Sequence, residues 1–198
     1  MPFSSPSSQT PFLFARGVRY FFPFSILFSI LLLASCGSVR PGAVKSARNL
    51  YETFYVGEDG TQYFIKPLKF ERPGDVKSEL LLDLTFRFRN EVRDTATLNF
   101  TIEDDRLYRS VERFEIAHPG FAAKSADIEL LYNQRAGDGF ASRFSARLPM
   151  ADLVKVFDSA DWTLTVQSGE GEMRYLPVGK TERAVVRLQD GVFVVFEN

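Results

Sequence analysis

Few residues of this chain have the side chains and spacing that catalysis or metal binding needs. The sequence contains one histidine, His118, and one cysteine, Cys36. With no second imidazole and no further thiol, we expect neither a histidine-based triad nor a zinc site, which takes several His or Cys ligands. His118 precedes Pro119 and Gly120, a pair typical of turns, so we expect it on a solvent-facing turn.

Two acidic runs offer the oxygen ligands that calcium prefers, but not the spacing of a calcium-binding loop. They are Glu58-Asp59 and Glu103-Asp104-Asp105. Acidic residues are common in turns, and we interpret both runs as turns at the ends of strands. Two carboxylates that are distant in the sequence can meet in the fold and hydrolyse a glycosidic bond. No pair stands out here.

The stretch Val178-Gly179-Lys180-Thr181 is similar to the end of a phosphate-binding loop. The first glycine of that pattern would fall at position 174, which is Arg174. Without this glycine the backbone cannot cradle a phosphate. We therefore predict no catalytic residue, no cofactor and no metal site, and we expect a non-catalytic protein.

The N-terminal segment has three zones. Residues 1–15 carry no charge, Arg16 and Arg19 supply positive charge, and residues 21–33 are almost wholly apolar. This order is typical of a secretory signal. The apolar zone is shorter than the roughly 20 residues of a comfortable bilayer span. The alternative is a transmembrane anchor over residues 18–34 with an incidental cysteine.

The apolar zone ends in Leu33-Ala34-Ser35-Cys36, which resembles the lipobox of bacterial lipoprotein precursors. The resemblance covers the first 36 residues. It implies that a diacylglycerol is attached to the Cys36 sulfur, that the chain is cut before Cys36, and that the new amino terminus is acylated. Two or three acyl chains hold a protein on a bilayer, whereas one binds marginally. No aspartate follows Cys36, which favours the outer membrane, with the domain facing the periplasm.

This assignment divides the chain into a leader, a tether and one domain. Residues 1–35 are the signal peptide, residues 36–48 are the lipidated cysteine with a polar, flexible tether, and residues 49–198 are long enough for a single core. A lipidated Cys36 leaves no free thiol, so disulfides and thiolate catalysis are excluded.

Alternation of apolar and polar residues predicts half-buried strands in the domain. In residues 80–89 the even positions, from Leu80 to Phe88, are all apolar. Residues 96–102 repeat the pattern, and the charged loop 90–94 would join the two runs as a hairpin. Further strands are expected at 51–56, 62–65, 111–117, 126–132, 140–148, 162–167 and 174–178.

Two short helices are also expected. Residues 149–160 have Leu153, Val154 and Phe157 at helical spacing behind a proline. Residues 181–189 are expected to be a helix capped by Thr181, although residues 184–188 would also fit a strand. The fold class is mostly β: a two-layer antiparallel sandwich, immunoglobulin-like in broad architecture, or alternatively a partly closed barrel.

Charge excludes a nucleic-acid partner. The chain has a formal net charge of −1, and loss of residues 1–35, with Arg16 and Arg19 as their only charges, leaves 22 basic and 25 acidic residues, or −3. No polybasic footprint remains. Five arginines on or beside the polar faces of predicted strands are either a solvated surface or a basic face for an anionic partner such as lipid head groups or cell-wall polymer. They are Arg87, Arg89, Arg93, Arg143 and Arg147.

Three functions of different classes fit these observations. We favour a lipid-anchored envelope protein that binds another protein or supports an assembly, for which a filled core and a flat exposed patch are expected. The second is a carrier of lipid or another apolar ligand, which needs a hydrophobic cavity. The third is a carboxylate-dependent hydrolase, which needs two converging acids.

Overall fold

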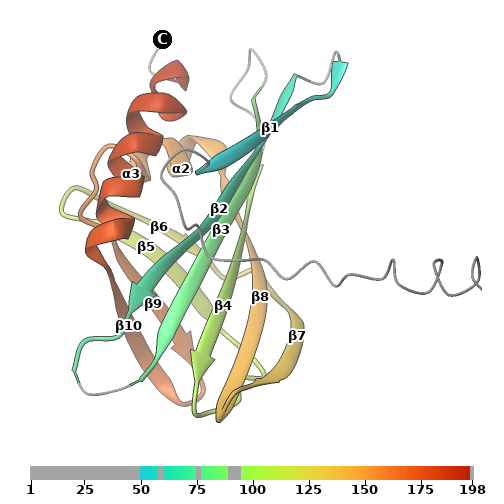
Figure 1. Cartoon of the computed structure of the whole chain (residues 1–198), viewed down its shortest axis with the longest axis vertical. Helices are drawn as coiled ribbons and strands as arrows, with labels where there is room; N and C mark the ends of the chain where they lie inside the picture. The colour runs from blue at the N-terminus through green and yellow to red at the C-terminus, as the bar shows by residue number, and fades with distance from the viewer. Residues whose placement is uncertain (1–49, 58–59, 75–76, 89–94, 197–198) are drawn as a thin grey trace, which may run out of the picture. The chain divides into compact units, whose positions relative to one another are not determined.

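The computed structural model of the chain describes residues 50–57, 60–74, 77–88 and 95–196. The signal peptide, the tether, Cys36, Arg89 and Arg93 lie outside these ranges. The described residues form strands, two α-helices and a 3₁₀ helix (Figure 1). In chain order they are β1 (Tyr51–Tyr55), β2 (Thr61–Glu71), β3 (Glu79–Phe88), β4 (Thr95–Asp104), β5 (Arg113–His118), β6 (Phe121–Ser125), β7 (Ile128–Ala136), β8 (Gly139–Pro149), α2 (Met150–Val156), β9 (Thr163–Ser168), β10 (Gly171–Pro177), α3 (Gly179–Gly191) and η2 (Phe193–Phe196).

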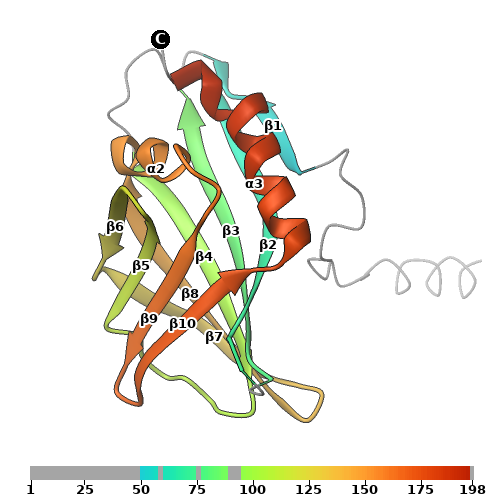
Figure 2. The ribbon, with the colours of Figure 1, turned by 90° about the vertical axis from the view of Figure 1, so that its left-hand side faces the viewer.

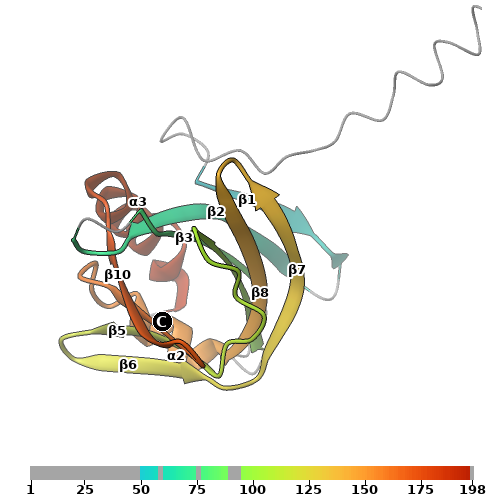
Figure 3. The same ribbon diagram turned by 90° about the horizontal axis from the view of Figure 1, so that it is seen from below.

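The strands form one antiparallel sheet with the order β6-β5-β9-β10-β2-β3-β4-β8-β7, and β1 pairs with β2 off this path. The sheet curls because its two edge strands, β6 and β7, are consecutive in the chain. Only Ala126 and Asp127 connect them. A two-residue link cannot cross a flat sheet whose neighbouring strands are about 4.8 Å apart. Figure 3 shows the resulting half-barrel, in which the chain passes directly from β6 to β7.

The prediction of a mostly β, antiparallel fold is confirmed. The partly closed barrel describes it well, and the two halves of the curled sheet face each other across the core as the layers of a sandwich do. The alternation in residues 80–89 and 96–102 corresponds to β3 and β4, which pair with Leu82 opposite Phe100. Strand β6 was not predicted, because Phe121–Ser125 has only one large apolar residue.

Helix α3 closes a gap between the two parts of the sheet. β10 pairs with β2 only at Leu176–Glu71 and Pro177–Phe70, so the edge of β2 beside Lys69 lacks a strand partner. The Thr181 hydroxyl fills this place: it donates to the Lys69 carbonyl oxygen over 2.6 Å and accepts from the Lys69 N–H over 3.2 Å. Figure 2 shows α3 rising from the end of β10 next to β2.

Both predicted helices exist with different limits. The helix expected at 149–160 is the shorter α2, and the one expected at 181–189 is α3, which excludes the strand alternative for 184–188. Thr181 is not the cap of α3. The helix begins after Val178, and Thr181 lies in its first turn with the hydroxyl committed to β2. Among the described residues, no helix combines the length and apolar character needed to cross a bilayer.

Aromatic side chains fill the space inside the half-barrel. Phe100 of β4 stacks on Phe114 of β5 with ring centroids 4.3 Å apart, which joins the two halves of the sheet. Phe144 stacks on Phe100 from β8. At the other end of the core, Phe157 after α2 stacks on Phe193 of η2 at 3.6 Å. These ring contacts connect opposite sides of the curled sheet through the core.

Candidate functional site

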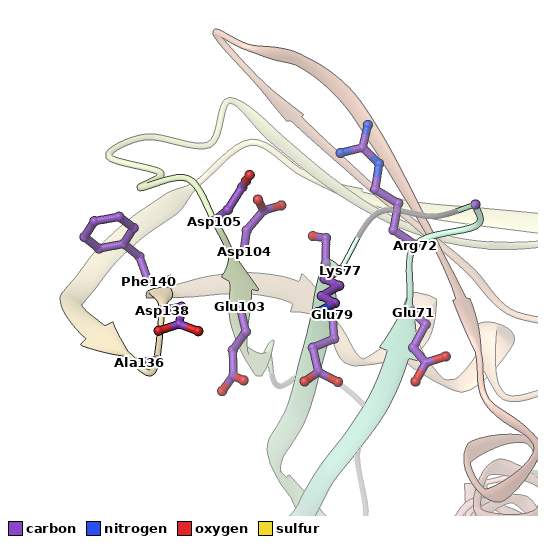
Figure 4. A pocket seen from close by; sticks show the side chains of 13 residues that line it. Glu71, Arg72, Lys77, Glu79, Glu103, Asp104, Asp105, Ala136, Asp138 and Phe140 are labelled. Carbon is purple, nitrogen blue, oxygen red and sulfur yellow. The ribbon is translucent and has the colours of Figure 1, made fainter.

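A pocket of about 570 Å³, most of whose lining residues are charged, lies at the end of the half-barrel where β2 leads into β3 and β7 turns into β8 (Figure 4). Its lining comprises Glu71, Arg72, Gly74, Lys77, Ser78, Glu79, Glu103, Asp104, Asp105, Ala136, Asp138, Gly139 and Phe140. The acidic run 103–105, interpreted from the sequence as a strand-end turn, thus forms one wall of this pocket.

Three glutamates of the pocket form a row across neighbouring strands. Glu79 of β3 stands opposite Glu71 of β2 and Glu103 of β4 in the register. The Lys69 ammonium binds both Glu79 and Glu71, the latter over 3.1 Å, and its pKa is raised by the hydrogen bond to Glu79. The pKa of Glu103 is raised, first by burial and then by the nearby charge of Glu79. The row is held together by one lysine that neutralises part of the repulsion.

Asp104 is buried on the opposite side of the strand from Glu103. Its carboxylate accepts hydrogen bonds from the Tyr108 hydroxyl at 3.1 Å and from the Arg106 N–H at 3.2 Å. Burial alone would raise the pKa of Asp104, but hydrogen bonds from Asp105, Ser78, Arg106 and Tyr108 outweigh burial and lower the pKa. The pKa of Asp105 is raised by its hydrogen bond to Asp104 and by the charge of Asp104, so Asp105 takes up a proton before Asp104 as the pH falls.

Two tyrosines complete this network. Burial and the charge of Asp104 strongly raise the pKa of Tyr108, so its hydroxyl remains a donor. Burial also raises the pKa of Tyr175, which shares a 3.0 Å hydrogen bond with Ser78. Within the described residues, every buried side-chain nitrogen and oxygen has a partner. The network is therefore a satisfied structural unit, and Asp104, with a low pKa and occupied lone pairs, is poorly suited to general acid or base catalysis at neutral pH.

The two sets of acids do not converge. Figure 4 shows the side chains of Glu71, Glu79 and Glu103 pointing to one side and those of Asp104 and Asp105 to the other. Alternation along β4 accounts for the opposite directions of Glu103 and Asp104, whereas Asp105 lies beyond the end of the strand. A hydrolase of the carboxylate type needs two acids that face one substrate. The described residues also contain no group of three or more His, Cys, Asp or Glu placed to hold a metal ion. The three glutamates of the row do face one side, but Lys69 binds Glu71 and Glu79, so the pocket does not single out a pair of free carboxylates for hydrolysis.

Gly139 allows the close approach of β8 to β4 at this pocket. A Cβ at position 139 would overlap the carbonyl oxygen of Asp104 and lie 3.1 Å from its carbonyl carbon. Because backbone atoms cannot move aside as a flexible side chain can, we expect Gly139→Ala to lower the free energy of unfolding by about 1–3 kcal/mol, measured by urea denaturation.

Gly169 is the matched control for this substitution. It lies in the β9–β10 turn, and a Cβ there would meet no atom within 4 Å. We expect Gly169→Ala to change the free energy of unfolding by no more than about 0.5 kcal/mol. Equal effects of the two substitutions would contradict the role given to Gly139.

The arginines predicted to form a basic face differ in their surroundings. Arg143 is largely buried: it forms an ion pair with Asp83 at 2.6 Å and donates to Thr101 at 2.9 Å. Arg87 donates to Gln62 at 3.3 Å. Arg147 is exposed on the same outer face of the sheet, opposite Thr97 of β4. The structure thus brings Arg87, Arg143 and Arg147 to one face, but the guanidinium of Arg143 is already committed to Asp83.

The residues that only resemble parts of functional motifs, His118 and Thr181, have structural roles. His118 ends β5 at the turn to β6; its Nδ1 accepts from the Gly120 N–H, so Nε2 carries the proton and donates to the Lys155 carbonyl oxygen at 3.0 Å. His118 is therefore the last residue of β5, beside a turn at Pro119 and Gly120, and it is partly buried rather than solvent-facing. In the stretch 178–181, the Thr181 hydroxyl forms the hydrogen bonds to the Lys69 backbone of β2 that are described above. The Glu58-Asp59 run lies outside the described residues.

Two exposed apolar surfaces are the features that the sequence did not reveal. One is edge strand β7, with Leu130, Leu131 and Tyr132 exposed. The other is the hairpin of β1 and β2, with exposed aromatic side chains described further below. Residues 126–132 were predicted as a strand, but nothing in their pattern says that this strand ends the sheet.

Comparison of the chain with protein-family models, with curated proteins and with solved structures finds no significant match. The function must therefore be argued from the chain's own surfaces.

Proposed function

We propose that this protein is a lipid-anchored component of the bacterial cell envelope whose domain binds a partner protein along edge strand β7. The anchor is the lipid on Cys36 that the Leu-Ala-Ser-Cys sequence implies, and the outer membrane, with the domain in the periplasm, is the expected location. The observation that carries the binding function is the exposed apolar edge strand over a filled core.

Strand β7 is a long and uncovered edge. It pairs with β8 on one side, and the sheet order ends there. All its residues from Glu129 to Arg135 are exposed, including Leu130, Leu131 and Tyr132. Natural proteins usually blunt such an edge, because its free N–H and C=O groups recruit further strands. The register shift between Leu130 and Tyr132 and the charges at both ends restrict pairing to a matching segment. These features favour addition of one extended segment from a specific partner.

The filled core argues against the carrier alternative. An apolar ligand of lipid size needs a cavity of several hundred Å³ lined by hydrophobic side chains. The interior is instead occupied by stacked rings such as Phe100 and Phe114, and the pocket at the end of the half-barrel is lined mainly by charged and polar residues. Protein binding is therefore the better-supported function.

A proline at Asn133 tests the binding edge. β7 and β8 are joined by a two-residue turn, so Ala136 bonds to Gly139 and, by alternation, the N–H of Asn133 points away from β8. We expect Asn133→Pro to leave the fold nearly intact and to abolish capture of the partner when the lipoprotein is purified from detergent-solubilised envelopes of its host.

Gln134→Pro is the control, because the N–H of Gln134 points toward β8. We expect it to lower the free energy of unfolding by about 1–3 kcal/mol through loss of a sheet hydrogen bond. Recovery of the same partner with Asn133→Pro would overturn the binding edge. Recovery of a bound lipid and no protein with the unmodified chain would support the carrier instead.

A further inference from the structure

The hairpin formed by β1 and the first part of β2 carries an apolar surface that the half-barrel does not cover. We define the aromatic hairpin as Tyr51, Phe54, Tyr55, Val56 and Phe64. Tyr55 is 81% exposed and Phe54 is 55% exposed. The rings of Phe54 and Phe64 pack edge to face with centroids 5.5 Å apart. By alternation, Phe54 and Phe64 lie on one face of the hairpin and Tyr51 and Tyr55 on the other, so the hairpin exposes aromatic side chains on both faces.

The base of the aromatic hairpin is fixed to the core. Tyr63, on the opposite face of β2 from Phe64, stacks on Phe86 at 5.2 Å. Phe86 in turn contacts Phe193 of η2 at 5.3 Å, and Tyr51 packs against Tyr63 at 6.1 Å. Because the strand is held in this way, binding through its exposed side chains loses little conformational entropy.

We propose that the aromatic hairpin lies in the interfacial region of the phospholipid bilayer to which the chain is anchored. The inference rests on the lipid anchor of the proposed function. Thirteen residues, 37–49, separate Cys36 from Leu50, whose carbonyl oxygen accepts a hydrogen bond from the Lys66 N–H of β2 at 2.9 Å. A chain of this length with the statistics of a random coil has a root-mean-square reach of about 20 Å. The anchor therefore keeps the hairpin at a high effective concentration next to the bilayer surface.

The chemistry of the hairpin and the tether fits a bilayer interface. Tyrosine combines a large apolar ring with a hydroxyl that stays hydrated, and tyrosines collect at the head-group level of a bilayer. Phenylalanine supplies apolar area that enters the boundary with the acyl chains. The tether carries Arg40, Lys45 and Arg48 and no acidic residue, which attracts anionic lipid. On β1, the Glu52 carboxylate is paired with Lys66 at 2.9 Å. Glu58 and Asp59, between β1 and β2, are acidic and oppose the attraction of the tether to anionic lipid, so the aromatic side chains must supply the binding energy of the hairpin.

Tryptophan reporters test the inference in the protein purified from its host's membranes. Phe54→Trp and Tyr55→Trp are placed on the hairpin, and Val186→Trp, at an exposed site of α3, is the matched control. The signal of buried Trp162 is subtracted with the unsubstituted chain. In vesicles of phosphatidylethanolamine and phosphatidylglycerol we expect the emission at positions 54 and 55 to shift to shorter wavelength and to lose most of its intensity when brominated phospholipid is included. The emission at position 186 is expected to stay unchanged.

The anchor is checked separately, so that its failure is distinguishable. If the mass of the purified protein shows an unmodified Cys36 thiol, the proposed anchor is wrong. The same thiol is then coupled to a maleimide phospholipid, and the reporters are read as before. Water-like emission at positions 54 and 55 on anchored protein would overturn the inference. So would a shift that appears in native envelopes but not in protein-free vesicles, because it would assign the hairpin to a protein partner.

Discussion

Cys36→Ser, in a chain whose residues 1–35 are replaced by a secretory leader that is cleaved without lipidation, is expected to move the protein from the membrane fraction to the soluble periplasmic fraction. Serine has no sulfur to carry a thioether-linked diacylglycerol. The acyl chains contribute about 0.8 kcal/mol per buried methylene, so two or three of them dominate membrane attachment. Fractionation and the intact mass of the purified protein measure this effect.

Ser38→Ala behind the native leader is the matched control, since position 38 lies outside the Leu33–Cys36 sequence. We expect it to remain membrane-bound and lipidated. An intact Met1 and an unmodified thiol in the unsubstituted protein would contradict the anchor and would favour a membrane anchor over residues 18–34. The aromatic hairpin and the β7 edge would then have to be interpreted without a lipid tether.

Trp162→Ala is expected to lower the free energy of unfolding by about 3–5 kcal/mol, measured by chemical denaturation. The indole is fully buried between Phe157, at 4.7 Å edge to face, and Phe70, stacked at 6.4 Å. Its N–H also donates to the carbonyl oxygens of Val156 at 3.0 Å and Ser159 at 2.7 Å. The substitution therefore leaves a cavity and removes the donor that holds the end of α2.

Trp162→Phe separates the two contributions. Phenylalanine keeps an aromatic ring between Phe157 and Phe70 but has no N–H, so we expect a smaller loss, of about 1–3 kcal/mol. A loss below about 1.5 kcal/mol for Trp162→Ala would show that α2 is held by other contacts, such as those of buried Leu153.

Local patterns of the sequence were sufficient to predict most strands and both helices. The alternation from Leu80 to Phe88 depends only on which side of one strand is buried, so it can be read without knowing the neighbours. Helix α3 was predictable because its buried residues, Thr181, Ala184, Val185 and Leu188, repeat at helical spacing. The hydrogen bonds of Thr181 to β2 were not predictable, because its partner Lys69 lies 112 positions away in the sequence.

The candidate site was much less predictable, because it depends on which strands become neighbours. Arg143 looked like a free cation on a polar strand face, yet the register places β8 beside β4 and lets its guanidinium reach Asp83 of β3. Glu71, Glu79 and Glu103 come from three strands and meet only through pairing. The aromatic hairpin also escaped notice, because Tyr51–Tyr55 alternates like a strand that would be half buried.

The sequence by itself determined the strand-rich character of the domain, the likeness of its first 36 residues to a lipoprotein leader, and the absence of the histidine and cysteine sets that common catalytic and zinc sites use. These properties follow from residue types and short-range spacing. Only the tertiary structure decided that β7 ends the sheet, that the core is filled, and that the acids face opposite ways. Such properties depend on contacts between residues far apart in the chain, which no local period encodes.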